Sequence, residues 1–368
     1  MYHARRITLA WEVLLKRSWP LLVAGAACLI LMSSGLYWFA LSGKARRIPL
    51  TAATTTGSAV TYAATSTERV ARSLDGVVVD AGNEALLPFA VMLDNLPEAR
   101  PISGLALANL VFELPVEGGA TRYLAVFDAA TRVEQIGPVR SARPYAIELA
   151  DGLQAMFAHV GGSPEALDKL QRLRAFRDLN QYWNGRFFWR AQKRLAPHNV
   201  YTRSDLLTAA ARVKKFSPGQ FNPWKYKADD QIKASSTVRA RGVEDGPRVS
   251  FGGQFNVAWS YDRSTNQYVR SLAGERQKDL DGQQVWAKNV VVMLTDGHVL
   301  DTEGRLRVRT IGIGHATLYR DGQKHELGWK RTAGQHIQIM DVEGSEAEFN
   351  RGTTWIEVVT DPTIIKTD

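Results

Sequence analysis

Residues 137–145 read Gly-Pro-Val-Arg-Ser-Ala-Arg-Pro-Tyr, and the folded part of the chain is predicted to be organised around this stretch. Pro138 and Pro144 fix φ and cannot donate to a strand ladder, so the residues between them are expected to form a stiff turn. This turn carries Arg140 and Arg143, with Ser141 between them. The pattern predicts either a grip on one anion or a clamp on neighbouring acidic side chains.

Apolar runs and punctuating turns on both sides of this stretch predict alternating strands and helices. Tyr145 to Leu149 favours a helix with Pro144 at its first position. A second turn, Gly161-Gly162-Ser163-Pro164-Glu165, places Ser163 as the N-cap of the next helix. Strands are predicted at 87–93, 110–116, 123–127 and 154–160. This alternation is typical of an α/β domain, assigned to residues 74–216.

The chain beyond residue 175 divides into a cover, a connector and a β-rich domain. Residues 176–198 interleave aromatic side chains with arginines, a pattern that can stack on bases or sugars but more often forms a partly buried amphipathic cover. Ser204 is predicted to cap a further helix, and residues 217–247 to form a polar connector. Short apolar runs between glycine turns predict a mostly antiparallel β domain at 248–368. Its strands are predicted at 255–261, 285–294, 305–313, 316–319, 337–340 and 355–359.

The net charge of +9 over 368 residues suggests nucleic acid at first sight. Residues 1–48 hold seven basic residues against one acidic residue, so they carry +6 and leave about +3 for the remaining 320 residues. The charge therefore belongs to the N-terminal segment, and no nucleic-acid partner is expected. The histidines of the β-rich part lack metal-ligand spacing, so neither a metal nor a cofactor is expected.

Residues 19–41 contain no charged residue and are predicted to form one transmembrane helix behind a short basic cytoplasmic head, residues 1–18. In helical form these residues span roughly 34 Å, enough for a ~30 Å hydrocarbon layer. Residues 42–73, rich in Ala, Thr and Ser, read as a stalk that holds the body outside the cytoplasmic membrane. The alternative is a cleaved signal peptide with a weak site at 40–42. Cys28 lies inside the apolar run and faintly resembles a lipoprotein site, although more membrane sequence follows it.

Charged and polar residues collect at the predicted strand ends of the α/β domain, where such proteins assemble their sites. His159, Glu113 and Glu117 are the candidates for acid or base catalysis. Ser141 or Ser163 would be a nucleophile only with His159 within ~3 Å. The same charges can instead form a self-neutralising structural network. The candidate ligand-binding residues are Arg100, Arg122, Arg140, Ser141, Arg143, Gly161, Gly162 and Ser163.

Many short motifs in this order resemble the YerB-like family of bacterial envelope proteins, which are commonly lipoproteins with two adjacent domains of unknown function. The resemblance covers roughly residues 74–360 and implies location and layout, but no activity. The chain departs from the family in its anchor, which reads as membrane-spanning. The motifs are residues 88–95, 99–101, 112–113, 116–119, 121–122, 136–145, 159–164, 194, 197–199, 201, 288–290, 329–331 and 352–358.

Together these features predict a single-pass membrane protein that binds or organises an anionic envelope component, such as a cell-wall polymer, through an Arg/Gly-turn cleft. The alternative is a hydrolase of an envelope polymer that uses His159 with Glu113 or Glu117. Both predictions require Arg140, Arg143, His159 and Ser163 to open onto one solvent-reachable cleft. The predicted fold is an α/β N-terminal domain followed by a mostly antiparallel β C-terminal domain, behind one transmembrane helix.

Overall fold

The computed structural model describes residues 68–227 and 245–366, which belong to one compact unit. The predicted head, the predicted transmembrane helix and nearly all of the predicted stalk lie outside these residues. None of the helices within the two described ranges is long and apolar enough to cross a bilayer.

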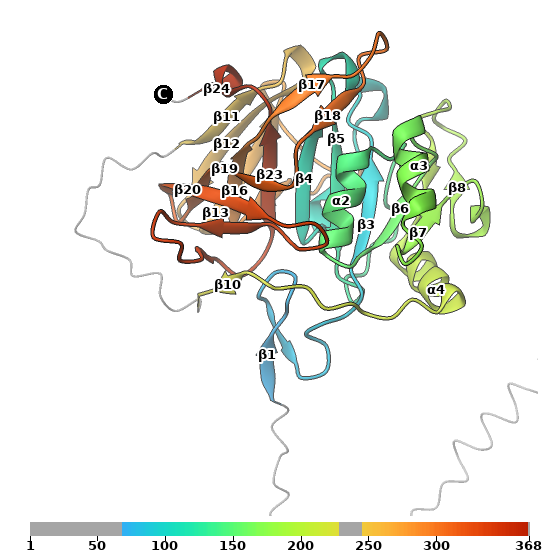
Figure 1. The fold of residues 1–368 in the computed structure, drawn as a ribbon, viewed down its shortest axis with the longest axis horizontal. Helices are drawn as coiled ribbons and strands as arrows, with labels where there is room; N and C mark the ends of the chain where they lie inside the picture. The colour runs from blue at the N-terminus through green and yellow to red at the C-terminus, as the bar shows by residue number, and fades with distance from the viewer. Residues whose placement is uncertain (1–67, 228–244, 367–368) are drawn as a thin grey trace, which may run out of the picture. The chain divides into compact units, whose positions relative to one another are not determined.

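A ten-stranded sheet forms the centre of the molecule and takes strands from both halves of the sequence (Figure 1). β23 from the C-terminal half pairs in parallel with β4 from the N-terminal half, which joins the two halves in one sheet. In spatial order the strands are β21 (Gln338–Met340), β20 (Gln323–Arg331), β19 (Gly312–Arg320), β16 (Asn289–Leu294), β23 (Thr354–Val359), β4 (Leu110–Pro115), β5 (Thr121–Phe127), β3 (Phe89–Leu93), β6 (Met156–His159) and β7 (Asp178–Asn180).

The pairing directions place the ends of several strands along one edge of this sheet. β16, β23 and β4 are mutually parallel, as are β3, β6 and β7, and the antiparallel β5 between the two groups gives both the same direction. The loops that follow these six strands therefore leave from a shared edge, hereafter the C-terminal edge. Loops at such an edge are where α/β proteins commonly form binding sites.

Both faces of the central sheet are buried, so its inner strands read as continuous apolar runs instead of alternating ones. In β3, Phe89, Val91 and Leu93 belong to one core, whereas Ala90 and Met92 belong to the other. Every residue of β3, β4, β5 and β23 is buried. The sheet is thus the middle layer of the molecule.

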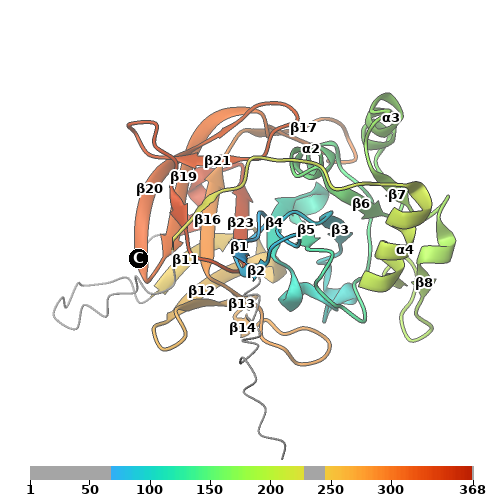
Figure 2. The same ribbon diagram turned by 90° about the horizontal axis from the view of Figure 1, so that it is seen from below.

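A second, smaller sheet and helix α4 (Ser204–Lys214) share one core with the central sheet, while helices α2 (Pro144–Gly152) and α3 (Pro164–Arg172) share the other. Figure 2 shows the second sheet and α2 on opposite sides of the central strands. The second sheet comprises β14 (Glu275–Arg276), β13 (Gln267–Leu272), β12 (Asn256–Asp262), β11 (Asp245–Ser250) and β24 (Ile365–Lys366), with β15 (Trp286–Ala287) paired to β13.

Four short two-stranded ribbons complete the β structure of the described ranges. The ribbons are β1 (Arg69–Ala71) with β2 (Val78–Asp80), β8 (Trp189–Arg190) with β9 (Val200–Tyr201), β10 (Lys225–Tyr226) with β22 (Glu348–Phe349), and β17 (Gly297–Val299) with β18 (Leu306–Val308). The residue before β10, Trp224, is buried, and its Nε1 donates to the carbonyl oxygen of Ile337 at 2.7 Å. This contact and the β10–β22 pairing anchor part of the predicted connector.

The fold is mostly β with few helices. The prediction that the C-terminal half is mostly antiparallel is confirmed. The helix starts at Pro144 and at Pro164 are confirmed, and the Ser163 hydroxyl accepts from the N–H of Ala166. The predicted cap at Ser204 is wrong. Arg203 holds the N-cap position, and the Ser204 hydroxyl accepts from the N–H of Val133 instead, because a tertiary partner 71 residues away competes for it. β13 and β20 are not predicted by the sequence pattern, because polar residues interrupt the alternation of apolar side chains in both strands.

The stretch around residues 136–142 makes backbone hydrogen bonds to several separate segments without forming a regular strand. Arg140 N–H donates to Met92 of β3, Val139 N–H donates to Val200 of β9, and Ala142 N–H donates to Gly161. Gly137 has φ +151°, and a Cβ there would lie 2.6 Å from the ring of Tyr201. The predicted stiff turn is therefore held by its surroundings as well as by its prolines.

A buried aspartate ties the second half of the chain to the first and makes stability depend on pH. Asp279 is 4% exposed and accepts from the N–H of Ala106 at 2.9 Å, while burial raises its pKa to about 7. Because this folded pKa exceeds the ordinary value, the stabilising contribution is present below about pH 4 and is lost as pH rises through 7. We expect Asp279→Asn to raise the free energy of unfolding at pH 8 by roughly 2 kcal/mol.

Urea denaturation at pH 5 and pH 8, followed by tryptophan fluorescence, measures this effect. Asp80→Asn is the matched control, because the Asp80 side chain is 60% exposed and pairs only loosely with Arg69 at 3.7 Å. An Asp279→Asn protein that is less stable than wild type at pH 8 would contradict the assignment.

Candidate functional site

The predicted site residues do gather near the C-terminal edge of the central sheet. Asp94 follows β3, Glu117 follows β4, and Gly161 closely follows β6. Residues 136–142 run across this edge and bring their arginines to the carboxylates. The structure thus joins in space residues that are up to 104 positions apart in the sequence.

Asp94 is the centre of the first charge group. Its carboxylate is fully buried, and Oδ2 accepts from Nδ1 of His198 at 2.7 Å and lies 3.0 Å from Nε of Arg140. The other oxygen accepts from the N–H of Leu96 at 3.2 Å. The side chains of Arg140 and His198 are only about 15% exposed. Through its contacts with both side chains, Asp94 holds two loops together.

Glu117 is the centre of the second charge group and contacts two arginines. Arg143 binds it in bidentate fashion through Nε and Nη2, and Arg122 Nη2 lies 3.6 Å from its carboxylate. Burial opposes ionisation of Glu117, but the hydrogen bond from Arg143 lowers the pKa below its ordinary value. Burial, with the neighbouring charge of Arg143, lowers the pKa of Arg122 to about 10. Arg143 is thus a clamp on an acidic side chain, one of the two roles that the 137–145 stretch predicts.

The glycine turn already uses several of its polar groups. Gly161 N–H donates to the side-chain oxygen of Asn180 at 3.1 Å, and Ser163 N–H donates to the carbonyl oxygen of Ala142. Ser163 is 7% exposed, and its hydroxyl caps α3. Ser141 enters the network through its carbonyl oxygen, which accepts from Arg122 at 3.0 Å.

His159 is fully buried, and both of its ring nitrogens have partners. Nδ1 lies 2.6 Å from the carbonyl oxygen of Gly161, and Nε2 lies 2.7 Å from the carboxylate of Asp178. Glu113 is also fully buried and contacts Arg270 of the second sheet. Arg100 donates to the carbonyl oxygen of Asn95 at 2.8 Å and covers the ring of Phe255.

The expected common cleft is not formed, because Arg143, His159 and Ser163 are at most 7% exposed. The residues lie near one edge, as predicted, but each is occupied by a neighbouring group: Arg143 by Glu117, His159 by Asp178 and Ser163 by the N–H of Ala166. Their roles in ligand binding or hydrolysis stay predictions.

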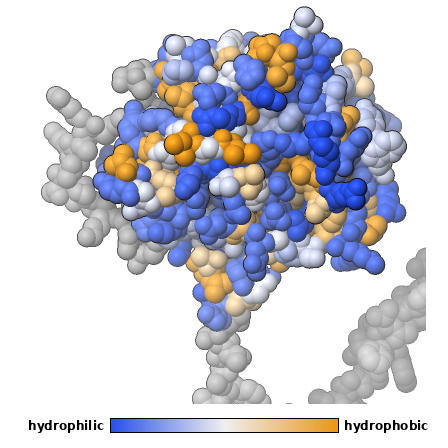
Figure 3. Space-filling model, in the orientation of Figure 1, coloured by the Kyte–Doolittle hydropathy of each residue, from blue (hydrophilic) through white to orange (hydrophobic). Residues whose placement is uncertain are grey.

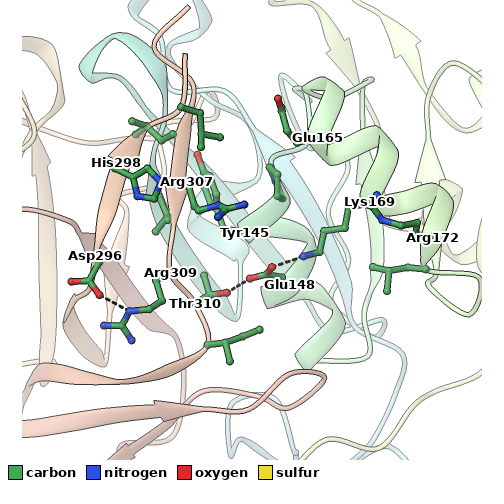
Figure 4. Close-up of a pocket in the computed structure, with 16 residues that line it drawn as sticks. Tyr145, Glu148, Glu165, Lys169, Arg172, Asp296, His298, Arg307, Arg309 and Thr310 are labelled. Atoms are coloured by element: carbon green, nitrogen blue, oxygen red, sulfur yellow. Dashed lines mark hydrogen bonds and ion pairs between the residues drawn. The ribbon is translucent and has the colours of Figure 1, made fainter. Parts of the chain in front are cut away.

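An open groove of about 710 Å³ lies beside this network, between α2 and α3 on one wall and the β17–β18 hairpin on the other (Figure 4). α2 begins directly after Arg143, so the clamp fixes one wall of the groove. Glu148 of α2 accepts from Lys169 of α3 and from the hydroxyl of Thr310. These contacts hold together segments from both halves of the chain.

The groove is richer in cations than in acids. Arg309 pairs with Asp296, and Lys169 pairs with Glu148. Arg307 is exposed, and its guanidinium makes no ion pair or hydrogen bond with any residue that the structure describes. Figure 4 shows it reaching from β18 into the groove towards Tyr145. A guanidinium in this setting can donate two parallel hydrogen bonds to a phosphate or carboxylate.

The groove residues were missed as a site, although the sequence carries a signal for them. Residues 305–309 read Arg-Leu-Arg-Val-Arg, an alternation of basic and apolar side chains with the period of a strand. By itself this alternation predicts a strand, and it does not indicate a binding site. Its relation to α2 and α3 depends on pairing between distant segments, which the pattern does not contain.

The aromatic stretch at 176–198 separates into two kinds of residue. Phe187 and Phe188 are buried in the core shared with the second sheet. Tyr182 and Trp183 are 66% and 83% exposed. The prediction of a partly buried cover therefore describes the first pair, whereas the second pair faces solvent.

Comparison with known proteins gives a consistent family. Residues 74–217 match the N-terminal domain, and residues 248–356 the C-terminal domain, of the family described as "Protein of unknown function (DUF3048)". The chain belongs to the DUF3048 family. Its DUF3048 region is similar to a Bacillus subtilis (strain 168) protein named "Putative lipoprotein YerB", with 34% identity over 280 residues, covering 74% of this chain and 81% of the relative. The YerB-like resemblance seen in the sequence is thereby confirmed.

The DUF3048 fold is also similar to a solved structure. The crystal structure of the YerB protein from Bacillus subtilis has a TM-score of 0.71 and 31% identity, and the match covers 80% of this chain and 98% of that chain. Neither the family description nor this relative's name assigns a reaction, so the chemistry must be argued from the groove.

Proposed function

We propose that this DUF3048 protein is tethered to the cytoplasmic membrane and binds an anionic envelope component on the extracytoplasmic side. The location is supported by the uncharged residues 19–41, which read as a single-pass transmembrane helix, and by the stalk-like residues 42–73. The name of the Bacillus relative, a lipoprotein, agrees with a membrane-attached body.

The groove between α2, α3 and the β17–β18 hairpin is the proposed binding place. The arginines of the 137–145 stretch are already paired with Asp94 and Glu117. Their proposed role is therefore to support the wall of the groove, and not to contact the ligand. The observation that carries the proposal is Arg307, an exposed cation inside a groove of ligand size with no carboxylate partner among the described residues. Lys169 and Arg309 lie on either side of it, but each is paired with a carboxylate, so Arg307 is the main candidate for contact with an anion.

Arg307→Gln is expected to weaken binding of poly(glycerol phosphate), a teichoic-type polyanion, about tenfold or more. Full-length protein in phosphatidylcholine nanodiscs would be titrated with the polymer by isothermal calorimetry. Affinity should also fall as salt is raised, because the contact is partly exposed.

Arg132→Gln is the matched control, because the Arg132 side chain is 86% exposed, pairs with Glu134 and lies outside the groove. The proposal fails if wild-type protein does not bind the polymer, or if the Arg307 and Arg132 variants bind it equally.

A further inference from the structure

The inner surface of the groove is largely apolar, although its rim is cationic. Tyr145 lies beneath it, but this side chain is 2% exposed and its hydroxyl donates to the carbonyl oxygen of Pro115 at 2.7 Å, so the surface open to a ligand comes from other side chains. Apolar side chains from the hairpin and from α3 continue this surface. They are Leu173, Leu300, Leu306, Val308 and Ile311.

Two of these side chains are left unusually exposed for their size. Leu300 is 40% and Ile311 is 41% exposed, and both line the groove. Val299 and Ile313, which neighbour them in the sequence, are 61% and 71% exposed. Figure 3 shows apolar side chains gathered on the upper part of this face, in the region of the β17–β18 hairpin. Contiguous apolar surface beside charged residues is typical of a binding site.

The arrangement of charge and apolar surface restricts what would fill the groove. A hydrophilic polyanion would satisfy Arg307, but it would leave the surface around Leu300 and Ile311 in water. A purely apolar ligand would remove water from Arg307 without offering a partner, which is costly for a charged group. A volume of about 710 Å³ also exceeds what a bare phosphate group fills.

We infer that the groove binds an anionic amphiphile, with a phosphate head on Arg307 and a single apolar chain along Leu300 and Ile311. This inference rests on the proposed function and names its ligand class, a lipid-carried form of the anionic envelope component. A protein tethered to the membrane has such molecules within reach. The phosphate would accept from the guanidinium, and the chain would cover the exposed hairpin side chains.

Chain length is the variable that tests the inference. Full-length protein in phosphatidylcholine nanodiscs would be titrated with glycerol 1-phosphate, ethyl phosphate and octyl phosphate, with empty nanodiscs subtracted. Each methylene that is fully buried contributes about fourfold to affinity. Because the groove is open, we expect octyl phosphate to bind at least about tenfold more tightly than ethyl phosphate.

The double variant Leu300→Ser with Ile311→Ser should bind glycerol 1-phosphate as wild type does and should lose most of the gain from chain length. Val342→Ser is the matched control, because Val342 is 93% exposed and lies outside the groove. Arg307→Gln should weaken all three phosphates by a similar factor. Thermal unfolding of each variant checks that the fold is retained.

The outcomes separate the inference from the proposed function. If none of the phosphates and no polyanion binds, both fail. If ethyl and octyl phosphate bind equally, or if the double variant keeps the chain-length gain, the inference is overturned while anion binding stands. If sedimentation shows self-association that the double variant abolishes and that octyl phosphate does not reduce, the inference is also overturned.

Discussion

Replacing Arg270 by methionine is expected to lower the free energy of unfolding by about 3–5 kcal/mol. Arg270 of β13 is fully buried between the two sheets, where it pairs with Glu113 of β4 and lies 3.7 Å from Glu357 of β23. Its guanidinium also lies 4.6 Å from the ring centre of Trp355. The substitution would leave Glu113 as a buried charge without its cation, the costly case for an internal ion pair.

Glu357 gives this cluster a measurable dependence on pH. Burial, together with the negative charge of Glu113, raises the pKa of Glu357 well above its ordinary value. Because the folded pKa is the higher one, the stabilising contribution of Glu357 is complete below its ordinary pKa and declines as pH rises towards the folded value. Glu357→Gln should therefore flatten the dependence of wild-type stability on pH between 5 and 8.

Urea denaturation followed by tryptophan fluorescence reports the loss directly, since Trp259 and Trp355 adjoin the cluster. The triple variant Glu113→Gln, Arg270→Met and Glu357→Gln is the compensating control, because it removes the cation and both acids together. It should recover much of the stability lost in Arg270→Met. If the free energy of unfolding of Arg270→Met lies within about 1 kcal/mol of the wild-type value, the predicted cost of leaving Glu113 without its cation is wrong.

Replacing Asp94 by asparagine is expected to cost about 3 kcal/mol. The fully buried carboxylate faces Arg140 at 3.0 Å and His198 at 2.7 Å. An amide of the same shape cannot neutralise Arg140, which would then repel Arg122 across the C-terminal edge. The expected loss is therefore electrostatic and should shrink when salt is added, as far as the side chains remain in contact with solvent.

The double variant Asp94→Asn with Arg140→Gln isolates this interaction, and its stability should exceed that of Asp94→Asn alone. A loss in the double variant equal to the sum of the two single losses would argue that the pair does not interact.

Local sequence signals predicted much of the fold. Ser163 caps α3, Pro144 begins α2, and the apolar runs before residue 160 became β3 to β6, because each signal acts within a few residues. The assignment to a two-domain, YerB-like family was also available from ordered motifs. The exception at Ser204 had a tertiary cause, the N–H of Val133.

The candidate site was predicted only in part. The positions of Glu117 and the arginines of residues 137–145 near one edge were predicted from the strand ends, because chain direction and strand order limit where loops emerge. The sequence left open whether these charges bind a ligand or neutralise one another, since ion pairing depends on distances of 4 Å or less between loops. Glu113 was proposed as an acid or base, yet it lies between the sheets against Arg270.

The sequence by itself determined the apolar strands β3 to β6 and the starts of α2 and α3. These properties depend on side-chain period, capping and hydrophobicity within short windows. Only the tertiary structure decided that β23 lies beside β4, that Arg270 meets Glu113, and that the β17–β18 hairpin faces α2 and α3. The physical reason is that such contacts follow from packing between residues more than a hundred positions apart. No local pattern of charge or hydrophobicity specifies which of the possible partners will meet.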